Sequence, residues 1–163
     1  YMLEYTRKPE YALGAHTGAL GLVFAQGGQR MGEAFANGAF VARHGSWNRK
    51  PPVGYDVIFV PFDANGNPRD AWAPVLSGFL AADGKTTRGR PTWLAWDAGG
   101  GLLVSDDTAG IIWRVIAPGA EPSPRPQAVV ADSLPAQRAL DGDLDRRFRA
   151  TIGDQYIVDP ARQ

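Results

Sequence analysis

Short apolar stretches alternate with turns rich in Gly, Asn, Asp and Pro along most of the chain. Residues 55–62 are apolar except for Asp56 and are rich in residues that favour strands. A strong turn signal follows at 63–68, and Asn37-Gly38 precedes another apolar stretch. The pattern predicts short β-strands, which we place at 20–25, 39–44, 55–62, 72–76, 92–97, 102–106 and 111–115, with a possible further strand at 127–130.

The strand pattern repeats. Residues 38–44 match 101–106, and residues 55–60 match 111–115, with a long insertion in the first copy. Four short strands per unit are typical of a β-propeller blade, so the fold is predicted to be all-β, with about two four-stranded blades. A plain antiparallel sandwich is the alternative. Two blades leave exposed edges and faces, so missing sequence, a second chain or self-association must cover them.

The character of the chain changes after Val115. Residues 118–126 are rich in Pro, and residues 134–149 could form a short helix. We therefore divide the chain into blades at 1–117 and an irregular or partly helical tail at 118–163. Residues 141–145 resemble the start of an EF-hand loop, but Arg146 replaces the required Gly and Ile152 the terminal Glu, which excludes calcium there.

Composition excludes several classes of function. The 163 residues include 17 Lys and Arg and 17 Asp and Glu, so zero net charge gives no reason to expect nucleic acid or an anionic membrane. The absence of Cys excludes disulfides and Cys-based zinc sites. No apolar run approaches the roughly 20 residues that span a bilayer, and the first residues lack a secretory signal pattern. Phosphate-binding, nucleophile-elbow and His-Glu-x-x-His motifs are also absent.

Four loops at predicted strand ends carry the residues suited to chemistry, and such loops gather at one mouth of a propeller. Arg suits carboxylate oxygens, His can abstract a proton from an alcohol, and Trp can stack on a sugar. The simpler alternatives are solvated Arg side chains, a His that satisfies a turn, Asp residues that cap turns and Trp residues that pack in the core. The loops are 15–18, 43–52, 88–91 and 105–108.

The same loops carry a family resemblance that spans roughly residues 9–117. The His-Gly-Ser-Trp-Asn-Arg stretch at 44–49 is its most specific part, supported by residues 16–24 and by 89–92 with 104–107. This pattern resembles the L-sorbosone dehydrogenase branch of the PQQ-dependent sugar dehydrogenases, with soluble glucose and aldose dehydrogenases as more distant relatives. The resemblance implies a six-bladed β-propeller that holds pyrroloquinoline quinone (PQQ) with calcium at one mouth.

The resemblance also implies roles for individual residues. Arg88 and Arg90 match an Arg-x-Arg that binds the quinone in the glucose dehydrogenases, and Arg49 or Lys50 would supply a further cation. His44 and Trp47 are expected to bind substrate. His16 is a secondary candidate for catalysis, because it falls near a cofactor-lining loop where the relatives carry another residue.

The resemblance places the catalytic His and the calcium ligands in earlier blades, outside this chain. We therefore expect the C-terminal part of a PQQ-dependent sugar or aldehyde dehydrogenase, inactive when isolated, with no metal ligand of its own. Its partners would be a sugar or aldehyde and the missing blades or a second chain, and its location periplasmic or secreted. The alternatives are a non-catalytic propeller-like module that binds carbohydrate or protein, and an inactive truncated domain.

Overall fold

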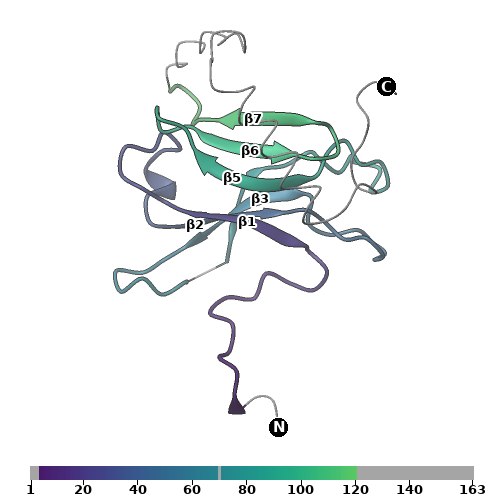
Figure 1. The fold of residues 1–163 in the computed structure, drawn as a ribbon, viewed down its shortest axis with the longest axis horizontal. Helices are drawn as coiled ribbons and strands as arrows, with labels where there is room; N and C mark the ends of the chain where they lie inside the picture. The colour runs from purple at the N-terminus through teal and green to yellow at the C-terminus, as the bar shows by residue number, and fades with distance from the viewer. Residues whose placement is uncertain (1–3, 70, 121–163) are drawn as a thin grey trace, which may run out of the picture. The chain divides into compact units, whose positions relative to one another are not determined.

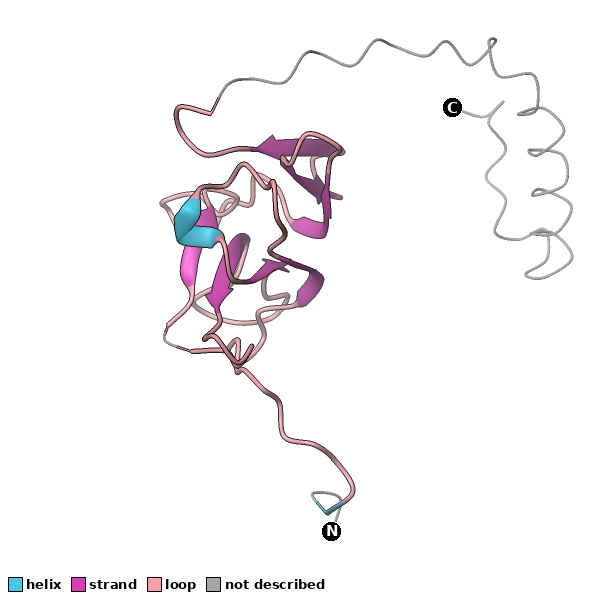
Figure 2. Cartoon of the chain, turned by 90° about the vertical axis from the view of Figure 1, so that its left-hand side faces the viewer, coloured by secondary structure: helices cyan, strands magenta, loops and turns pink. Residues whose placement is uncertain are grey.

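The computed structural model describes residues 4–69 and 71–120, which form two antiparallel sheets (Figure 1). The first sheet has the order β1-β2-β3-β4 and the second the order β5-β6-β7. A 3-10 turn at Glu33–Phe35 is the larger of the cyan segments in Figure 2. The strands are β1 (Ala19–Phe24), β2 (Gly38–Arg43), β3 (Asp56–Pro61), β4 (Ala73–Leu76), β5 (Pro91–Trp96), β6 (Leu102–Asp106) and β7 (Ile111–Val115).

The all-β prediction and its seven central strands are confirmed, each to within about two residues. The two repeat copies also occupy equivalent positions, since β2 lies between β1 and β3 as β6 lies between β5 and β7. The possible strand at 127–130, the possible helix at 134–149 and the rejected calcium loop at 141–145 lie outside the described residues. Among the described residues, no helix is long and apolar enough to cross a membrane.

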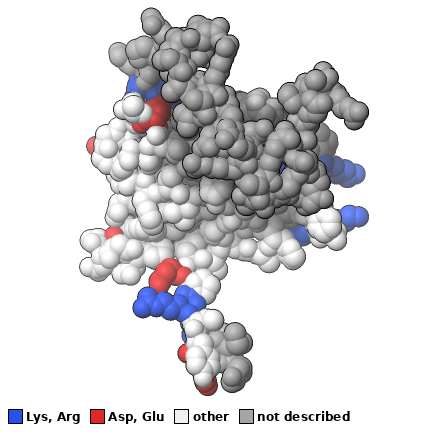
Figure 3. All heavy atoms as spheres, in the orientation of Figure 1, with Lys and Arg blue, Asp and Glu red and all other residues white. Residues whose placement is uncertain are grey.

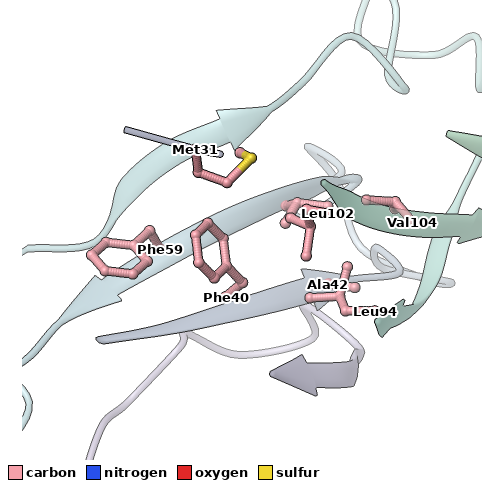
Figure 4. Packing of buried hydrophobic residues seen from close by; sticks show 8 residues of the cluster. Met31, Phe40, Ala42, Phe59, Leu94, Leu102 and Val104 are labelled. Atoms are coloured by element: carbon pink, nitrogen blue, oxygen red, sulfur yellow. The ribbon is translucent and has the colours of Figure 1, made fainter. Parts of the chain in front are cut away.

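The hydrophobic core joins the two sheets. Figure 4 shows Phe40 and Phe59 of the first sheet beside each other, with Leu102 of the second sheet nearby. The rings of Phe40 and Phe59 are 4.9 Å apart between centroids, and Trp96 meets Phe40 edge to face at 5.4 Å. Trp96 thus packs against the core as expected of an apolar indole, whereas Trp93 is largely exposed. The buried core residues are Met31, Phe40, Ala42, Val57, Phe59, Leu94, Leu102 and Val104.

The sheets meet most closely where β5 lies against β1 and β2. A Cβ atom placed on Gly21 of β1 would lie 2.6 Å from the carbonyl oxygen of Thr92 and 2.9 Å from the amide nitrogen of Leu94. The indole of Trp96 also donates a hydrogen bond of 3.0 Å to the carbonyl of Phe24. The absence of a side chain at position 21 therefore permits this backbone contact.

The outer faces of both sheets remain partly apolar and exposed. On the first sheet, Leu22 and Phe24 line a groove of about 480 Å³ together with Val41 and Val60. On the second sheet, Trp93 and Ile112 are 67% and 71% exposed. In the described part of the chain, no further layer covers these side chains.

Candidate functional site

The four loops singled out in the sequence lie at one edge of the two sheets. β2 ends at Arg43, which pairs with Ala19 at the start of β1 and with Asp56 at the start of β3. In the second sheet, β6 ends at Asp106, which pairs with Pro91 at the start of β5. Alternating strand directions therefore bring the connecting loops to a common edge. We call this the loop edge, formed by residues 14–18, 44–55, 77–90 and 107–110.

The long loop at 44–55 is held by its own hydrogen bonds. Gly45 has a φ of +97°, and a Cβ there would lie 2.5 Å from the Tyr55 ring, so only Gly fits. The amide of Ser46 donates to the carbonyl of Val53 at 2.9 Å, and the Val53 amide donates to the Ser46 hydroxyl at 3.1 Å. The buried Tyr55 hydroxyl donates to the Ser46 carbonyl. These hydrogen bonds therefore fix the base of the loop.

Asp106 organises the second sheet's part of the loop edge. Its side chain is almost fully buried, and Oδ1 accepts hydrogen bonds from the amides of Arg90 and Ala109 at 2.9 and 3.0 Å. Oδ2 accepts from the Trp113 indole at 3.3 Å. Burial by itself raises the pKa of Asp106, but these hydrogen bonds outweigh it and the pKa is lowered. The expectation that Asp106 caps a turn is confirmed.

His44 and Arg90 connect the two sheets at the loop edge. The Nε2 atom of His44 lies 3.1 Å from both carboxylate oxygens of Asp107. The Arg90 guanidinium donates to the carbonyls of His44 and Gly45 at 3.0 and 2.8 Å and lies over the Tyr55 ring at 5.3 Å. The hydrogen bond from His44 lowers the pKa of the Asp107 carboxyl, which therefore remains ionised near neutral pH.

The remaining candidate side chains have different surroundings. Trp47 is 91% exposed, and the side chains of Lys50 and Arg88 are also exposed. Neither cation makes a hydrogen bond or salt bridge with a residue in 4–69 or 71–120. Arg49 instead donates to the carbonyl of Ala15 at 2.9 Å.

Two of the candidate cations, Arg88 and Arg49, line different hollows. Arg88 lines one of about 420 Å³ with Phe79, Ile111 and Trp113. Arg49 lines another, of about 660 Å³, with Arg43 and Thr17. The structure thus brings Arg90 and His44 together but places Arg88 and Arg49 in separate hollows. His16 is exposed and has a φ of +64°.

The sequence analysis did not predict the ion pair between Arg43 and Asp56, which is largely buried. Arg43 donates to both oxygens of Asp56, at 2.7 and 2.6 Å, and its guanidinium lies 4.2 Å from the centroid of the Trp72 ring. Pairing of strand ends brings Arg43 and Asp56 opposite each other, so only the register could have revealed the pair. In Figure 3 most of the described surface on the face drawn is white, and red and blue side chains lie beside each other at its lower end.

The lowered carboxyl pKa values predict a loss of stability in acid. A carboxyl whose folded pKa is depressed stabilises the fold above its unfolded value of 3.8, and the contribution is lost as pH falls through the folded pKa. Asp106 belongs to this class, as does Asp97, whose pKa is lowered by its hydrogen bond from Arg114; Asp107 contributes little because its side chain is 54% exposed. We therefore expect the urea midpoint to stay constant between about pH 5 and 7. It should decrease as the pH is lowered below about 4. An unchanged midpoint at about pH 3 would contradict this.

Comparison with known proteins identifies the family. Residues 3–117 match the TrAA12-like family. A PQQ-dependent pyranose dehydrogenase of Coprinopsis cinerea is 36% identical over 138 residues, covering 71% of this chain and 18% of that protein. An uncharacterised protein of Borreliella burgdorferi is 37% identical over 105 residues, covering 64% of this chain and 27% of that protein. This chain therefore spans about a fifth to a quarter of the length of these relatives.

Solved structures give similar matches. The holo PQQ domain of pyranose dehydrogenase from Coprinopsis cinerea is 34% identical with a TM-score of 0.47, covering 60% of this chain and 26% of that domain. A calcium structure of a Trichoderma reesei enzyme of carbohydrate-active family AA12 is 28% identical with a TM-score of 0.48, covering 60% and 24%.

These relatives correct the sequence-based assignment to a subfamily. The prediction of the L-sorbosone dehydrogenase branch is wrong, because the matches are to the TrAA12-like family and a pyranose dehydrogenase. The motifs that suggested that branch are short strands and the loops that join them, and such motifs recur on related scaffolds with different functions. The chain belongs to the TrAA12-like family.

Proposed function

We propose that this chain supplies two neighbouring blades of a β-propeller and part of the PQQ-binding wall of a pyranose-oxidising enzyme. The observation that carries the proposal is the convergence of four loops, with His44, Arg90 and Trp47, at one edge of two repeated sheets in a TrAA12-like chain. The 36% identity to a PQQ-dependent pyranose dehydrogenase supports the cofactor and the substrate class. Because the chain spans only part of its relatives, the activity of the whole enzyme belongs to this proposal.

The arrangement of the sheets supports the propeller. The first strands of the two sheets, β1 and β5, lie against each other, as the innermost strands of adjacent blades do. Exposed apolar side chains such as Leu22 and Trp93 on the outer faces suit packing against further blades. The family match ends at residue 117, which supports a boundary between the blades at 1–117 and the tail at 118–163.

The cationic side chains of the loop edge fit a ligand with several carboxylates. PQQ is a tricarboxylate whose quinone accepts the hydride when a sugar is oxidised. Arg88 and Lys50 offer donors that make no hydrogen bond to the described residues, so they are the first candidates for its carboxylates. Two donor groups of Arg90 and one of Arg49 already bind backbone carbonyls, so these two residues would act mainly by holding the loops.

No metal ligand is assigned to this chain. Within residues 4–69 and 71–120, no three side chains of His, Cys, Asp or Glu gather where they could hold a metal ion. Calcium ligands belong, in this proposal, to other parts of the enzyme. A periplasmic or secreted location also goes with the proposal and can be tested by fractionating cells that express the native gene.

Titration of the full chain with PQQ tests the proposed function. We expect saturable quenching of Trp fluorescence, because Trp47 is exposed at the loop edge. Arg88→Gln and Lys50→Gln should each weaken binding by about tenfold or more, since each removes a charge-assisted hydrogen bond.

Arg69→Gln is the matched control, because Arg69 lies at the opposite ends of the strands and lines a hollow with Asn37 and Asp63. It should leave PQQ binding unchanged. Quenching that never saturates, or equal losses in all three variants, would contradict the proposed wall.

A further inference from the structure

The two sheets pack against each other through faces that are not equivalent in the repeat. Val104 of β6 corresponds to Val41 of β2, because the two lie at matching positions of the repeated sequence. Val104 is buried in the cluster between the sheets together with Phe40, the neighbour of Val41 on β2 (Figure 4). Val41 belongs to a separate cluster, since adjacent residues of a strand point to opposite faces. The contact therefore joins one face of the first sheet to the equivalent of its other face.

The outer face of the first sheet carries the same kinds of residue as the buried face of the second. The strand registers make Leu22 of β1 the equivalent of Leu94 of β5, and Phe24 the equivalent of Trp96. Leu94 is 8% exposed and Trp96 packs against the core, whereas Leu22 and Phe24 are 54% and 61% exposed. The first sheet thus offers, on its open side, a surface like the one on which it packs itself.

The outer face of the second sheet is the complementary half of that contact. Leu103 of β6 stands at the position of Phe40, and Ile112 of β7 stands at the position of Val57. Phe40 and Val57 are buried between the sheets, but Ile112 is largely exposed. The two open faces of one chain are therefore equivalent to the two faces that already pack together inside it, so each can receive the other from a second copy.

We propose that the outer face of the first sheet docks onto the outer face of the second sheet of another copy of this chain. The contact is head to tail, because the two copies use different faces, and such contacts close into rings when the rotation allows it. Propellers contain roughly 4–8 sheets, so a closed ring would hold about two to four copies. The inference takes the pairing of sheets as blades from the proposed function, but it does not depend on the cofactor.

Two replacements make this contact weaker than the internal one. Trp93 stands at the position of Gly21, where even a Cβ would lie 2.6 Å from a backbone oxygen of the facing strand. Arg114 stands at the position of Phe59, although its charge is paired with Asp97. The close spacing of β1 and β5 is therefore not available beside Trp93, and the wild-type chain should associate only at high concentration.

Sedimentation equilibrium of the full chain tests the inference. The mean mass of the wild type should rise with concentration. Trp93→Gly should tighten self-association by about tenfold or more, because it removes the overlap that holds the sheets apart. Trp93→Ala is the matched control, since it removes most of the same apolar surface but keeps a Cβ, and it should not tighten association. Leu22→Ser should weaken association by about tenfold, both alone and together with Trp93→Gly.

The sign of the Trp93→Gly effect distinguishes docking of sheets from general stickiness of apolar surface. Association driven by exposed apolar area alone would weaken when the indole is lost, and that result would overturn the inference. A single-copy mass at every concentration for both the wild type and Trp93→Gly would also overturn it and leave these faces to other blades of a longer protein.

Two further measurements complete the test. Urea unfolding checks that each variant is folded; if Trp93→Gly is not, Leu22→Ser decides, and unchanged association in that variant would overturn the inference. Titration with PQQ separates the inference from the proposed function. Loss of PQQ binding with self-association intact would overturn the proposed quinone-binding wall alone, whereas PQQ binding by a chain that stays a monomer in both forms would overturn this inference alone.

Discussion

Asp106→Ala should lower the free energy of unfolding by about 3–5 kcal/mol, because it removes three hydrogen bonds to a buried carboxylate. The amides of Arg90 and Ala109 and the indole of Trp113 all bind this carboxylate, which is 1% exposed. The three donors belong to partly or fully exposed residues, so the loss comes mainly from the charge-assisted hydrogen bonds themselves. Urea unfolding followed by circular dichroism measures the loss.

Two neighbouring variants make this prediction specific. Asp106→Asn keeps one carbonyl oxygen as an acceptor, so it should cost less, about 2 kcal/mol. Asp107→Asn lies one residue away, but its side chain is 54% exposed, so it should change stability little. If Asp106→Ala were no more destabilising than Asp107→Asn, the role given to Asp106 in joining β5, β6 and the turn before β7 would be wrong.

Gly21→Ala should destabilise the chain by about 3 kcal/mol, although it adds only one methyl group. The new Cβ would lie 2.6 Å from the Thr92 carbonyl oxygen and 2.9 Å from the Leu94 amide nitrogen. Both are backbone atoms of β5, so no side-chain rotation relieves the overlap and the sheets must separate. Hydrogen exchange of the β5 amides, together with the urea midpoint, measures the effect.

Gly27→Ala is the matched control for Gly21→Ala. A Cβ placed on Gly27 would have no heavy atom within 4 Å, so the same methyl group should be tolerated. Equal destabilisation by the two variants would show that the loss comes from glycine's general properties and not from the contact between β1 and β5.

The sequence could predict the strands and the loops for a simple physical reason. A short apolar run rich in β-branched and aromatic residues, as in 55–62, indicates a buried strand, and Asn-Gly or Gly-Gly pairs indicate turns. Because adjacent strands run antiparallel, the loops of alternate connections must share an edge. The grouping of the loops around His16, His44, Arg90 and Asp106 therefore followed from local pattern and topology.

The branch of the family could not be obtained in the same way. The motif at residues 44–49 lies in one loop, and such loops recur on related scaffolds with different substrates. Comparison over residues 3–117 corrected the assignment from a sorbosone dehydrogenase to the TrAA12-like family.

The sequence alone therefore determined the all-β class, the repeated strand order and the loops that carry His44, Trp47 and the cations. The tertiary structure decided which of these side chains interact. It paired His44 with Asp107, 63 residues away, and bound Arg90 to the carbonyls of His44 and Gly45. Local patterning cannot reveal such contacts, because they depend on how closely the two sheets approach, and that approach depends on Gly21 and on the shared core.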